Sequence, residues 1–488
     1  MKVFSVRFSH RKAFCTSWLL AFLFLSYWQR IKKNEYAGGS RLVISSNHAE
    51  YVLNDNSYIA ASSSFENNNL SQSLHSSTGS STQRRRRHVF NLTEFGAVGD
   101  NKTVNTAAFE AAVAAVKAVE GDGGGQIIVG PGIWLTAPFN VTSHMTLFLC
   151  QDASIVGIQT ESLWPLIPVL PSYGHGHEHP GPRYSSLIHG QYLNDFIITG
   201  ENGSIDGQGA WWWRQHKLRK LKYTRGHLIE LLWSSNIEIS NVTLRNSPFW
   251  TVHPYDCTNV TIHGVTILAP LNAPNTDGID PDSCRNVLVE NCYISVGDNA
   301  VAIKSGWDVY GTQYARPCVN ITIRNLFARS LISGGVSIGS EVAGGVEDVV
   351  VDGLHIWGSR SAVRIKTSTG RGGYVRNISY SNLTLNDVRV AIAIQIDSGE
   401  HPNSGFDPRA LPQVSNISFN GIFGSEVRYP VIISGTQEVP ITGIEIRNMN
   451  LSVTQNKNKK NIFQCSFLQG KVVGYIFPLP CKELVHEI

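Results

Sequence analysis

The stretch NIEISNVTL at residues 236–244 decides the fold, because near copies of it return along most of the chain. A turn residue opens each copy, alternating Ile and Val residues follow, and an Asn or Gly precedes a further apolar residue. The next copies are NVTIHGVTI at residues 259–267 and NVLVEN at residues 286–291. Successive copies start 23 to 39 residues apart. Further copies begin at Asn320, Asp348, Asn377, Asn416 and near Gly443.

The alternation of apolar and polar residues predicts short strands that turn one face inward. β-branched residues dominate, and no helical pattern separates the copies, which excludes a βαβ series. Hairpin dipeptides are scarce between the strands, which argues against a sandwich. A period of 20 to 40 residues with one or two strands per unit is typical of a parallel β-helix, in which stacking buries the inner face of each coil. We therefore expect an all-β solenoid with longer loops that wall a groove.

An Ala-rich stretch, TAAFEAAVAAVKAV at residues 106–119, has the apolar spacing of a helix. It follows FGAVGD at residues 95–100 and precedes a Gly-rich stretch at residues 123–125. An open end of a β-helix exposes unpaired strand edges, which promote aggregation unless they are covered. We expect this short helix to cap the N-terminal end of the solenoid.

Residues 1–33 form a basic and apolar leader whose uncharged run covers residues 13–28. As a helix, this run spans about 24 Å, which is less than the ~30 Å hydrocarbon core of a bilayer. A cleaved signal peptide and an uncleaved signal anchor are both open. We favour the anchor because the nearest small-residue site, at residues 37–39, lies beyond three further positive charges. Either alternative predicts that the chain enters the secretory pathway. Any contact with a membrane is then expected to be made through the leader.

Residues 34–88 are rich in Ser and Asn and predict a disordered linker, because such a composition buries too little to offset its ordering entropy. Four arginines at residues 84–87 end it, either as a processing site or as a solvated charge run. The folded domain is expected at residues 89–488. Beyond Asn69 the chain holds many Asn-x-Ser/Thr triplets, which fit a glycoprotein.

The charge balance argues against a nucleic-acid partner. The net charge of +4 divides into +8 over residues 1–88 and −4 over the remainder. A nucleic-acid binder needs a broad basic face, which a slightly acidic body does not supply. A polyanionic ligand must therefore be met by a few placed cations, and we expect the domain to be a monomer.

Of the eight cysteines, seven lie outside the leader, and none belongs to a cluster with zinc spacing. Cys465 and Cys481 are expected to form a disulfide that closes the C-terminus. Cys284 and Cys292 are a second candidate pair. The odd number implies at least one free, buried thiol.

Three charged groups fall on successive coils. The first is NTDGID at residues 275–280, the second is Gly297-Asp298-Asn299, and the third is the RIK triplet at residues 364–366. Stacked coils bring such residues onto one face although they are far apart in sequence. Two carboxyl groups that flank a glycosidic bond are what acid-catalysed hydrolysis requires, and Arg and Lys pair with a uronate carboxylate. Asp and Asn are also ordinary corner residues of a β-helix.

Several longer stretches resemble plant polygalacturonases of glycoside hydrolase family 28. The stretches are FWTVHP (249–254), NTDGIDPDS (275–283), VAIKSGWD (301–308), RIKT (364–367) and GRGGY (370–374), together with the opening FGAVGD. The resemblance covers roughly residues 89–460. It implies a right-handed, single-stranded parallel β-helix without metal or cofactor, which hydrolyses α-1,4-galacturonosyl linkages in pectin with inversion. It also implies an extracellular, cell-wall location, or a membrane-anchored domain in the lumen or outside the cell.

The resemblance assigns roles to individual residues. Asp298 is similar to the general acid, and Asp277 is similar to one of two carboxylates that activate water. Arg364 and Lys366 resemble the clamp for the substrate carboxylate, and Asn275 is expected to bind substrate. Asn299 departs from the pattern, because an Asp is expected there.

Asn299 cannot accept a proton as a base. It also removes one negative charge beside Asp298, which weakens that residue as an acid near neutral pH. The sequence therefore predicts reduced hydrolysis with binding retained. Ser333-Gly334-Gly335 replaces a Gly-His-Gly of other members, a difference that is usual in this plant subgroup.

Two rival functions remain open. One is a catalytically impaired pectin-binding protein. The other, a calcium-dependent pectate lyase, lacks support because the RIK and NTD motifs argue against it. Two further stretches lie outside these motifs, and each has two interpretations. The three Trp at residues 211–213 either stack on sugar rings or pack in the core, and the His-containing loop at residues 165–183 is expected to be solvated rather than metal-binding.

Overall fold

The computed structural model describes residues 42–46, 49–53, 86–397, 399–454 and 463–487, and the chain divides into two units, 1–82 and 83–488. In the first unit, β1 (Leu42–Ser46) pairs antiparallel with β2 (Ala49–Leu53). Both strands lie inside the range predicted to be a linker, where runs such as Leu42-Val43-Ile44 favour extended backbone. The predicted leader lies outside the described residues. No helix among the described residues is long and apolar enough to cross a membrane.

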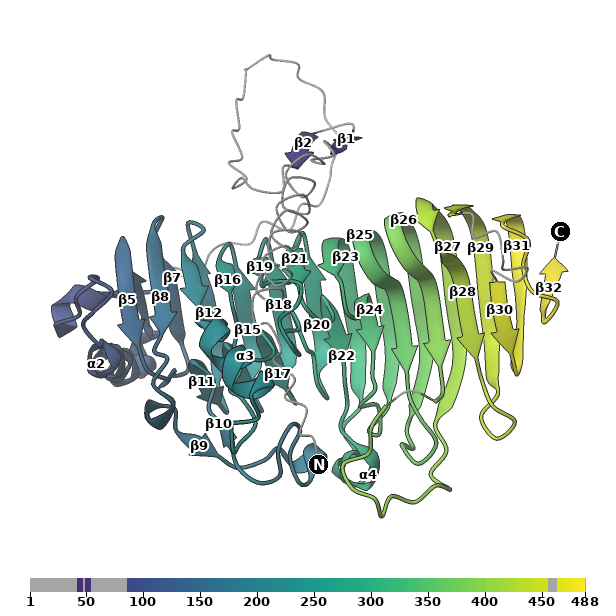
Figure 1. The fold of residues 1–488 in the computed structure, drawn as a ribbon. Coiled ribbons are helices and arrows are strands. Elements are labelled where there is room, and N and C mark those ends of the chain that lie inside the picture. Colours follow the sequence, from purple (N-terminus) through teal and green to yellow (C-terminus); the bar gives the residue numbers. More distant parts are fainter. Residues whose placement is uncertain (1–41, 47–48, 54–85, 398, 455–462, 488) are drawn as a thin grey trace, which may run out of the picture. The chain divides into compact units, whose positions relative to one another are not determined.

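The second unit is the predicted all-β solenoid, a right-handed parallel β-helix with its coils stacked in a row (Figure 1). The strands of its large sheet pair in parallel, and each strand pairs with the strand one coil further along the chain. The strands of this sheet are β3 (His88–Asn91), β4 (Gly125–Val129), β5 (Gly132–Thr136), β7 (Met145–Leu149), β8 (Ala153–Gly157), β12 (Asn194–Gly200), β13 (Ser204–Asp206), β15 (Ser235–Ser240), β16 (Thr243–Arg245), β18 (Thr258–His263), β19 (Thr266–Leu268), β20 (Arg285–Glu290), β21 (Tyr293–Val296), β22 (Val301–Ile303), β23 (Cys318–Ser330), β24 (Gly334–Ile338), β25 (Val346–Lys366), β26 (Tyr374–Gln395), β27 (Gln413–Val427), β28 (Tyr429–Ser434), β29 (Ile441–Val453), β30 (Phe463–Ser466), β31 (Leu468–Phe477) and β32 (Leu484–Glu487).

A four-stranded parallel sheet forms another side of the N-terminal coils. It contains β6 (Phe139–Asn140), β11 (Ile188–Gln191), β14 (Ile229–Leu232) and β17 (Val252–Tyr255). Isolated bridges continue it from Val252 through Ile279 to Val301 in β22, and β22 pairs with β24. This side of the solenoid therefore runs without interruption from β6 to β25, and it carries the residues of the candidate site.

The repeat that begins at Asn236 is built on a corner with left-handed backbone. The residues that open the copies at 236, 259, 286, 320, 348, 377, 416 and 443 all have φ between 54° and 67°. Asn and Asp tolerate this conformation better than other residues with a side chain, which explains their use there. Their side chains also form a ladder, in which the amide of Asn259 donates to Asn236 at 3.1 Å and that of Asn286 donates to Asn259 at 3.0 Å.

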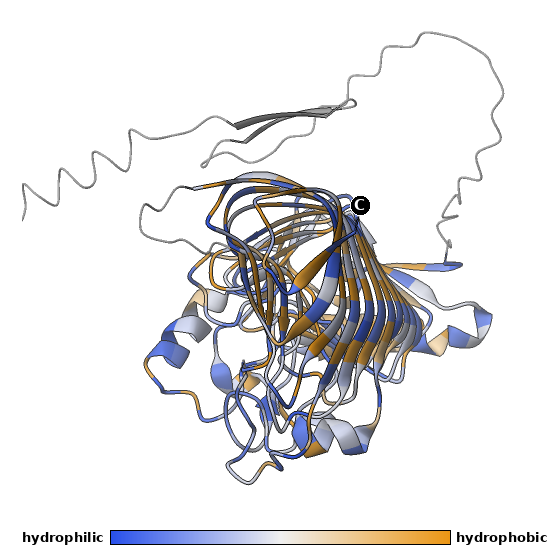
Figure 2. Cartoon of the chain, turned by 90° about the vertical axis from the view of Figure 1, so that its right-hand side faces the viewer, coloured by the Kyte–Doolittle hydropathy of each residue, from blue (hydrophilic) through white to orange (hydrophobic). Residues whose placement is uncertain are grey.

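Inward-facing residues of successive copies stack in register. Ile237 pairs with Val260, Val260 with Val287, Val287 with Ile321, and Ile321 with Val349. Each of these five side chains is at most 2 % exposed. Figure 2 shows apolar and polar bands that continue from one strand to the next along the stack. One coil therefore buries the face that its neighbour leaves open.

Both ends of the solenoid have the closures that the sequence predicts. The helix α2 (Thr106–Ala118) lies at the N-terminal end (Figure 1), where Phe109 stacks on Phe139 with ring centroids 4.5 Å apart. Cys465 and Cys481 form the predicted disulfide near the C-terminus.

The second candidate disulfide was wrong, since Cys284 and Cys292 are both free thiols. They occupy inward positions at opposite ends of β20, and each Sγ bonds to backbone carbonyl oxygens instead. The prediction of at least one free, buried thiol is confirmed, because Cys257, Cys284, Cys292 and Cys318 are all buried and unpaired.

The arginine run at the predicted end of the linker is partly integrated into the fold. Arg86 is 8 % exposed, and its guanidinium donates to both carboxylate oxygens of Asp195 at 2.7 and 3.0 Å. A solvated charge run is therefore the wrong interpretation for Arg86. The first strand of the second unit, β3, starts at His88, one residue before the predicted boundary at residue 89.

Candidate active site

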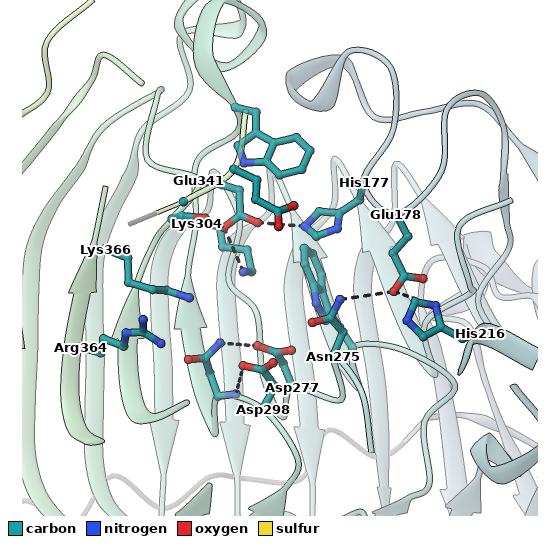
Figure 3. A pocket seen from close by; sticks show the side chains of 16 residues that line it. His177, Glu178, His216, Asn275, Asp277, Asp298, Lys304, Glu341, Arg364 and Lys366 are labelled. Atoms are coloured by element: carbon teal, nitrogen blue, oxygen red, sulfur yellow. Dashed lines mark hydrogen bonds and ion pairs between the residues drawn. The ribbon is translucent and has the colours of Figure 1, made fainter. Parts of the chain in front are cut away.

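A pocket of about 590 Å³ lies on the side of the solenoid that runs from β6 to β25. The six residues predicted from the sequence all line it, although they come from three separate segments (Figure 3). These residues are Asn275, Asp277, Asp298, Asn299, Arg364 and Lys366. Stacking of parallel coils brings them together, because each coil repeats the same path about 4.8 Å further along the axis.

The backbone register explains how Asp277 meets Asn299. The bridge between Ile279 and Val301 places the two segments on adjacent coils, and Gly278 N–H donates to the carbonyl of Asn299 at 2.9 Å. Asp277 and Asn299 therefore stack directly. Asp298 lies beside them, and its Oδ1 accepts the backbone N–H of Asn299 at 3.0 Å.

Asp277 is a buried carboxyl with an unusual proton affinity. Its side chain is 2 % exposed, and burial, reinforced by the negative charge of Asp298, raises its pKa to about 7. Lys304 and the amide of Asn299 act in the opposite direction. Two neighbouring carboxyl groups that share one proton are suited to acid–base chemistry. Figure 3 shows Asp277 and Asp298 side by side at the floor of the pocket.

Asn299 is held by two short hydrogen bonds. Its Nδ2 donates to Asp277 Oδ2 at 2.6 Å, and its Oδ1 accepts the Ser333 hydroxyl at 2.5 Å. The side chain is 2 % exposed. The amide therefore contacts the neighbouring carboxyl group directly. Ser333, from the triplet that replaces Gly-His-Gly, completes this chain by accepting a 3.4 Å hydrogen bond from Arg364.

The predicted clamp lies beyond Asp298 on β25. Arg364 and Lys366 are two residues apart on one strand, so both side chains project to the same face. Burial lowers the pKa of both residues, and neighbouring cations lower them further. Because Lys366 also has Lys304 and Arg364 near it, an anionic ligand relieves the mutual repulsion of these cations.

A buried ionic cluster lies near the carboxyl pair, and sequence reasoning did not single it out. Lys304 is 3.3 Å from Glu341 and 3.8 Å from Asp280. Burial by itself lowers the pKa of Lys304, but Glu341 and Asp280 outweigh it and raise that pKa. Burial and the nearby Asp277 raise the pKa of Asp280 well above its ordinary value. Lys304 lies in VAIKSGWD, one of the stretches that carry the family resemblance, so a signal for it existed, and Glu341 follows Gly335 by six residues.

The loop at residues 165–183 contributes to the pocket, so the prediction of a solvated loop was wrong. His177 stacks on Trp307 with ring centroids 4.8 Å apart, and its Nε2 is 2.9 Å from Glu341 Oε1. Glu178 lines the same pocket and pairs with the fully buried Arg225 at 2.5 Å. No local pattern in the loop predicts these contacts, because both partners come from distant coils.

The three Trp at residues 211–213 pack against the core. They lie on α3 (Gly209–Lys217), where Trp212 is fully buried and Trp213 is 8 % exposed. Trp212 contacts Trp164 edge to face with ring centroids 5.0 Å apart. Of the two interpretations of these residues, core packing is the one that the structure supports.

One buried group outside the pocket has the residue types of a metal site. His227, Glu230 and His253 bring one ligand atom each within 4.8 Å of one another. Arg183 Nη1, however, lies 2.7 and 2.8 Å from the two oxygens of Glu230, so an arginine already neutralises the carboxylate. A second cation beside that guanidinium is disfavoured by charge repulsion, and we interpret the group as a structural network.

Comparison with known proteins identifies the family. The model of glycosyl hydrolases family 28 matches residues 174–472. A probable polygalacturonase of Vitis vinifera is 44 % identical over 399 residues, which cover 82 % of this chain and 81 % of that protein. An endo-polygalacturonase of Pectobacterium carotovorum subsp. carotovorum is 30 % identical over 346 residues, which cover 68 % of this chain and 80 % of that protein. The crystal structure of a hyperthermoactive exopolygalacturonase from Thermotoga maritima matches with a TM-score of 0.68 at 25 % identity, covering 82 % of this chain and 92 % of that one. The resemblance is thus confirmed: the chain belongs to glycosyl hydrolases family 28 and is a polygalacturonase-like glycoside hydrolase.

Proposed function

We propose that this protein hydrolyses α-1,4-galacturonosyl linkages in pectin with inversion at the anomeric carbon. The observation that carries the proposal is the meeting of Asp277 and Asp298 in one pocket with Arg364 and Lys366. A carboxyl pair supplies acid and base, and two cations at its side match a uronate substrate.

Each side chain has a role in the proposed reaction. Arg364 and Lys366 pair with a galacturonate carboxylate and position the glycosidic bond. Asp298 donates its proton to the leaving oxygen as the bond to the anomeric carbon breaks. Asp277 accepts a proton from the water that attacks from the opposite face, so the product has inverted configuration. The reaction moves one proton from Asp298 to the substrate and one from water to Asp277.

The pair must carry one proton in the active form. In the free protein the pKa of Asp277 is about 7, so at mildly acid pH the proton lies on Asp277. The assigned roles need that proton on Asp298. The proton must therefore move from Asp277 to Asp298 when substrate binds. Bound substrate favours this move because its glycosidic oxygen then lies against Asp298 and a water lies against Asp277. The move is possible because two neighbouring carboxyl groups titrate as one unit.

We infer that turnover is reduced relative to a site with three carboxyl groups. Asn299 offers no second base, and its amide donates to the oxygen of Asp277 that the water would otherwise approach. The same contact supports a second candidate function, a pectin-binding protein in which the clamp survives and catalysis does not. Both candidates require the pectic chain to bind at Arg364 and Lys366.

The two candidates differ in an experiment with purified protein and polygalacturonate. We expect wild type to release reducing ends and Asp298→Asn to lose this activity by a factor of about 10²–10⁴, with binding unchanged in affinity electrophoresis. Asp387→Asn, at an exposed position, is the matched control. Proton NMR of the first product should show the inverted anomer. Binding without any turnover in wild type would establish the second candidate, and absence of both would refute the proposed substrate.

We propose the secretory pathway as the route of the chain, with the folded domain outside the cell or in the lumen. The apolar run at residues 13–28 and the many Asn-x-Ser/Thr triplets support this location. Fractionation of cells that express the tagged full-length chain checks it, and a cytosolic fraction would contradict it.

A further inference from the structure

One end of the pocket is walled by residues that no coil of the solenoid supplies. Glu178 and His177 come from the loop between β9 (Leu166–Ile167) and β10 (Arg183–Tyr184), and His216 comes from α3. In Figure 3, Glu178 and His216 lie beyond Asn275, on the side of the carboxyl pair away from Arg364 and Lys366. The wall is therefore an addition to the groove, at a defined end of it.

The wall begins immediately next to the catalytic coil. Asn275 Nδ2 donates to Glu178 Oε1 at 3.3 Å, and Asn275 is two residues before Asp277. Arg225, which pairs with Glu178, also contacts the segment just before Asn275. The Nη1 of Arg225 donates to the backbone carbonyl of Pro274 at 3.0 Å and to that of Pro248 at 2.7 Å. Coils are spaced by about 4.8 Å, close to the length that one sugar ring occupies along a chain, so there is room for very few rings between Asp277 and the wall.

Buried contacts fix this wall in place. Arg183 at the base of the loop pairs with Glu230 of β14 at 2.7 Å, with both side chains at most 8 % exposed. The hydroxyl of Tyr173 donates to Asp282 at 2.5 Å. His177 lies against Trp307. Since buried pairs are costly to break, the loop is a rigid boundary and not a lid that opens for each substrate.

The charge of the wall discriminates between the end and the middle of a polyuronide. Arg225 outweighs the effect of burial and lowers the pKa of Glu178 to about 2, so Glu178 is an anion at any working pH. Arg225 balances the charge of Glu178, but an ionised Glu178 has no proton to donate. The carboxylate of a further galacturonate in the direction of the wall would therefore lie against it without a hydrogen bond. A terminal sugar brings hydroxyl groups instead, and these donate to a carboxylate.

The direction of the chain follows from the proposed roles. Asp277, on the coil nearer the wall, activates the water that attacks the anomeric carbon. Asp298, on the next coil, protonates the leaving oxygen, and the leaving sugar extends toward Arg364. The sugar whose anomeric carbon is attacked therefore lies on the walled side, and the non-reducing end of the chain points at Glu178.

We propose, resting on the polygalacturonase function above, that this protein acts from the non-reducing end of the polyuronide and that Glu178 binds a hydroxyl group of the terminal sugar. Glu178 is then a specificity-determining residue, held by Arg225. The remainder of the polymer then extends on the other side of the carboxyl pair, past Arg364 and Lys366.

The product pattern tests this proposal. Oligogalacturonides of one defined length, labelled at the reducing end, should yield one short unlabelled product from the first time point. The labelled partner should be correspondingly long, and polygalacturonate should lose little viscosity. Labelled fragments of all lengths at early times, with a rapid fall in viscosity, would overturn the proposal while leaving the hydrolytic function intact. If no oligomer were cleaved at all, the proposed hydrolytic function would be refuted. The binding of the non-reducing end at Glu178 would then be decided by the binding measurement below.

A binding measurement keeps the proposal falsifiable even if turnover is very slow. An oligomer whose terminal unit is 4,5-unsaturated lacks the 4-hydroxyl group and should bind at least tenfold more weakly than the saturated oligomer of equal length. The difference should shrink in Glu178→Gln, which also should cleave a larger fraction of substrate internally. Glu438→Gln, at an exposed position, is the matched control and should behave as wild type. Equal affinities of wild type for the two oligomers would overturn the proposal.

Glu178→Gln leaves the buried Arg225 without its charge partner, so a second variant guards against misfolding. His216→Ala removes the neighbour whose Nδ1 is 3.6 Å from Glu178 Oε1 and whose side chain is partly exposed. It should fold normally and widen the walled end, which raises the share of internal cleavage. A folded His216→Ala with an unchanged product pattern and an unchanged binding difference would contradict the assignment of the wall.

Discussion

Asn299→Asp should change the pH dependence of hydrolysis more than its maximum. The active wild-type pair carries one proton, and burial raises the pKa of Asp277 to about 7. Above that pH the pair loses this proton, so kcat/KM should fall about tenfold for each further pH unit. The raised pKa thus keeps the wild-type protein active in mild acid and limits its activity above neutral pH.

The substitution converts the 2.6 Å contact between Asn299 and Asp277 into a pair of carboxyl groups. Two carboxyl groups at this separation hold one proton between them, so one remains ionised down to ordinary acid pH while the pKa of the other rises. Ser333, which now donates to Asn299 Oδ1, is able to donate to the new carboxylate as well. The site gains a second group that can accept a proton and keeps its own proton to higher pH, so we expect a gain of a few-fold at pH 5 that rises to about 10- to 100-fold at pH 8.

The assay is reducing-end release from polygalacturonate between pH 4.5 and pH 8, with thermal unfolding as a check on the fold. Asn450→Asp is the matched control, since it makes the same change at an exposed position of β29, remote from the pocket. Superimposable profiles for wild type and Asn299→Asp, or a gain that is larger at pH 5 than at pH 8, would refute this account of Asp277. High and equal activity of the two proteins would also refute the inferred loss of turnover.

Three further outcomes are expected. Arg364→Lys should raise KM for polygalacturonate about 10-fold or more with a smaller effect on kcat, because a lysine loses the fork that pairs with a carboxylate; an unchanged KM would remove this residue from the clamp. Arg183→Met breaks the buried pair with Glu230 and should cost about 3–5 kcal/mol of unfolding free energy in a denaturant titration, whereas Arg409→Met, which breaks an exposed pair with Asp407, should leave the midpoint unchanged. Extensive dialysis against EDTA should leave both activity and the melting temperature unchanged, since Arg183 already neutralises the carboxylate of the buried His-Glu-His group; a loss that calcium or zinc restores would contradict this.

The fold was predictable because its signal is local and repeated. The alternation around Ile237 and the left-handed corner residue recur along the coils. Each copy of the pattern therefore predicts the same inward face and the same left-handed turn. The capping helix and the Cys465–Cys481 disulfide were predictable for a similar reason, since each depends on residues close in sequence. Cys284 and Cys292 were not, because adjacent spacing says nothing about which way two thiols point within a coil.

The six candidate residues were found through motif resemblance, and the coil register then explained why they meet. The neighbouring charges that shift the pKa values of these residues were harder to predict from the sequence. Lys304 and Glu341 lie in recognisable stretches, but their pairing across 37 residues depends on the stacking of two coils. The hydrogen bond from the Asn299 amide to Asp277 likewise depends on the register of two adjacent coils.

The sequence by itself determined a parallel β-helix, the family and the residues of a carboxyl pair with a cationic clamp, because a repeat of short strands fixes which side chains face inward and which share a corner. Only the tertiary structure decided what surrounds that pair. His177 and Glu178 belong to a loop without any repeat, and their partners Glu341 and Arg225 are 164 and 47 residues away. Burial and long-range charge are properties of the packed molecule, so neither the pKa of Asp277 nor the walled end of the pocket is encoded in any single stretch.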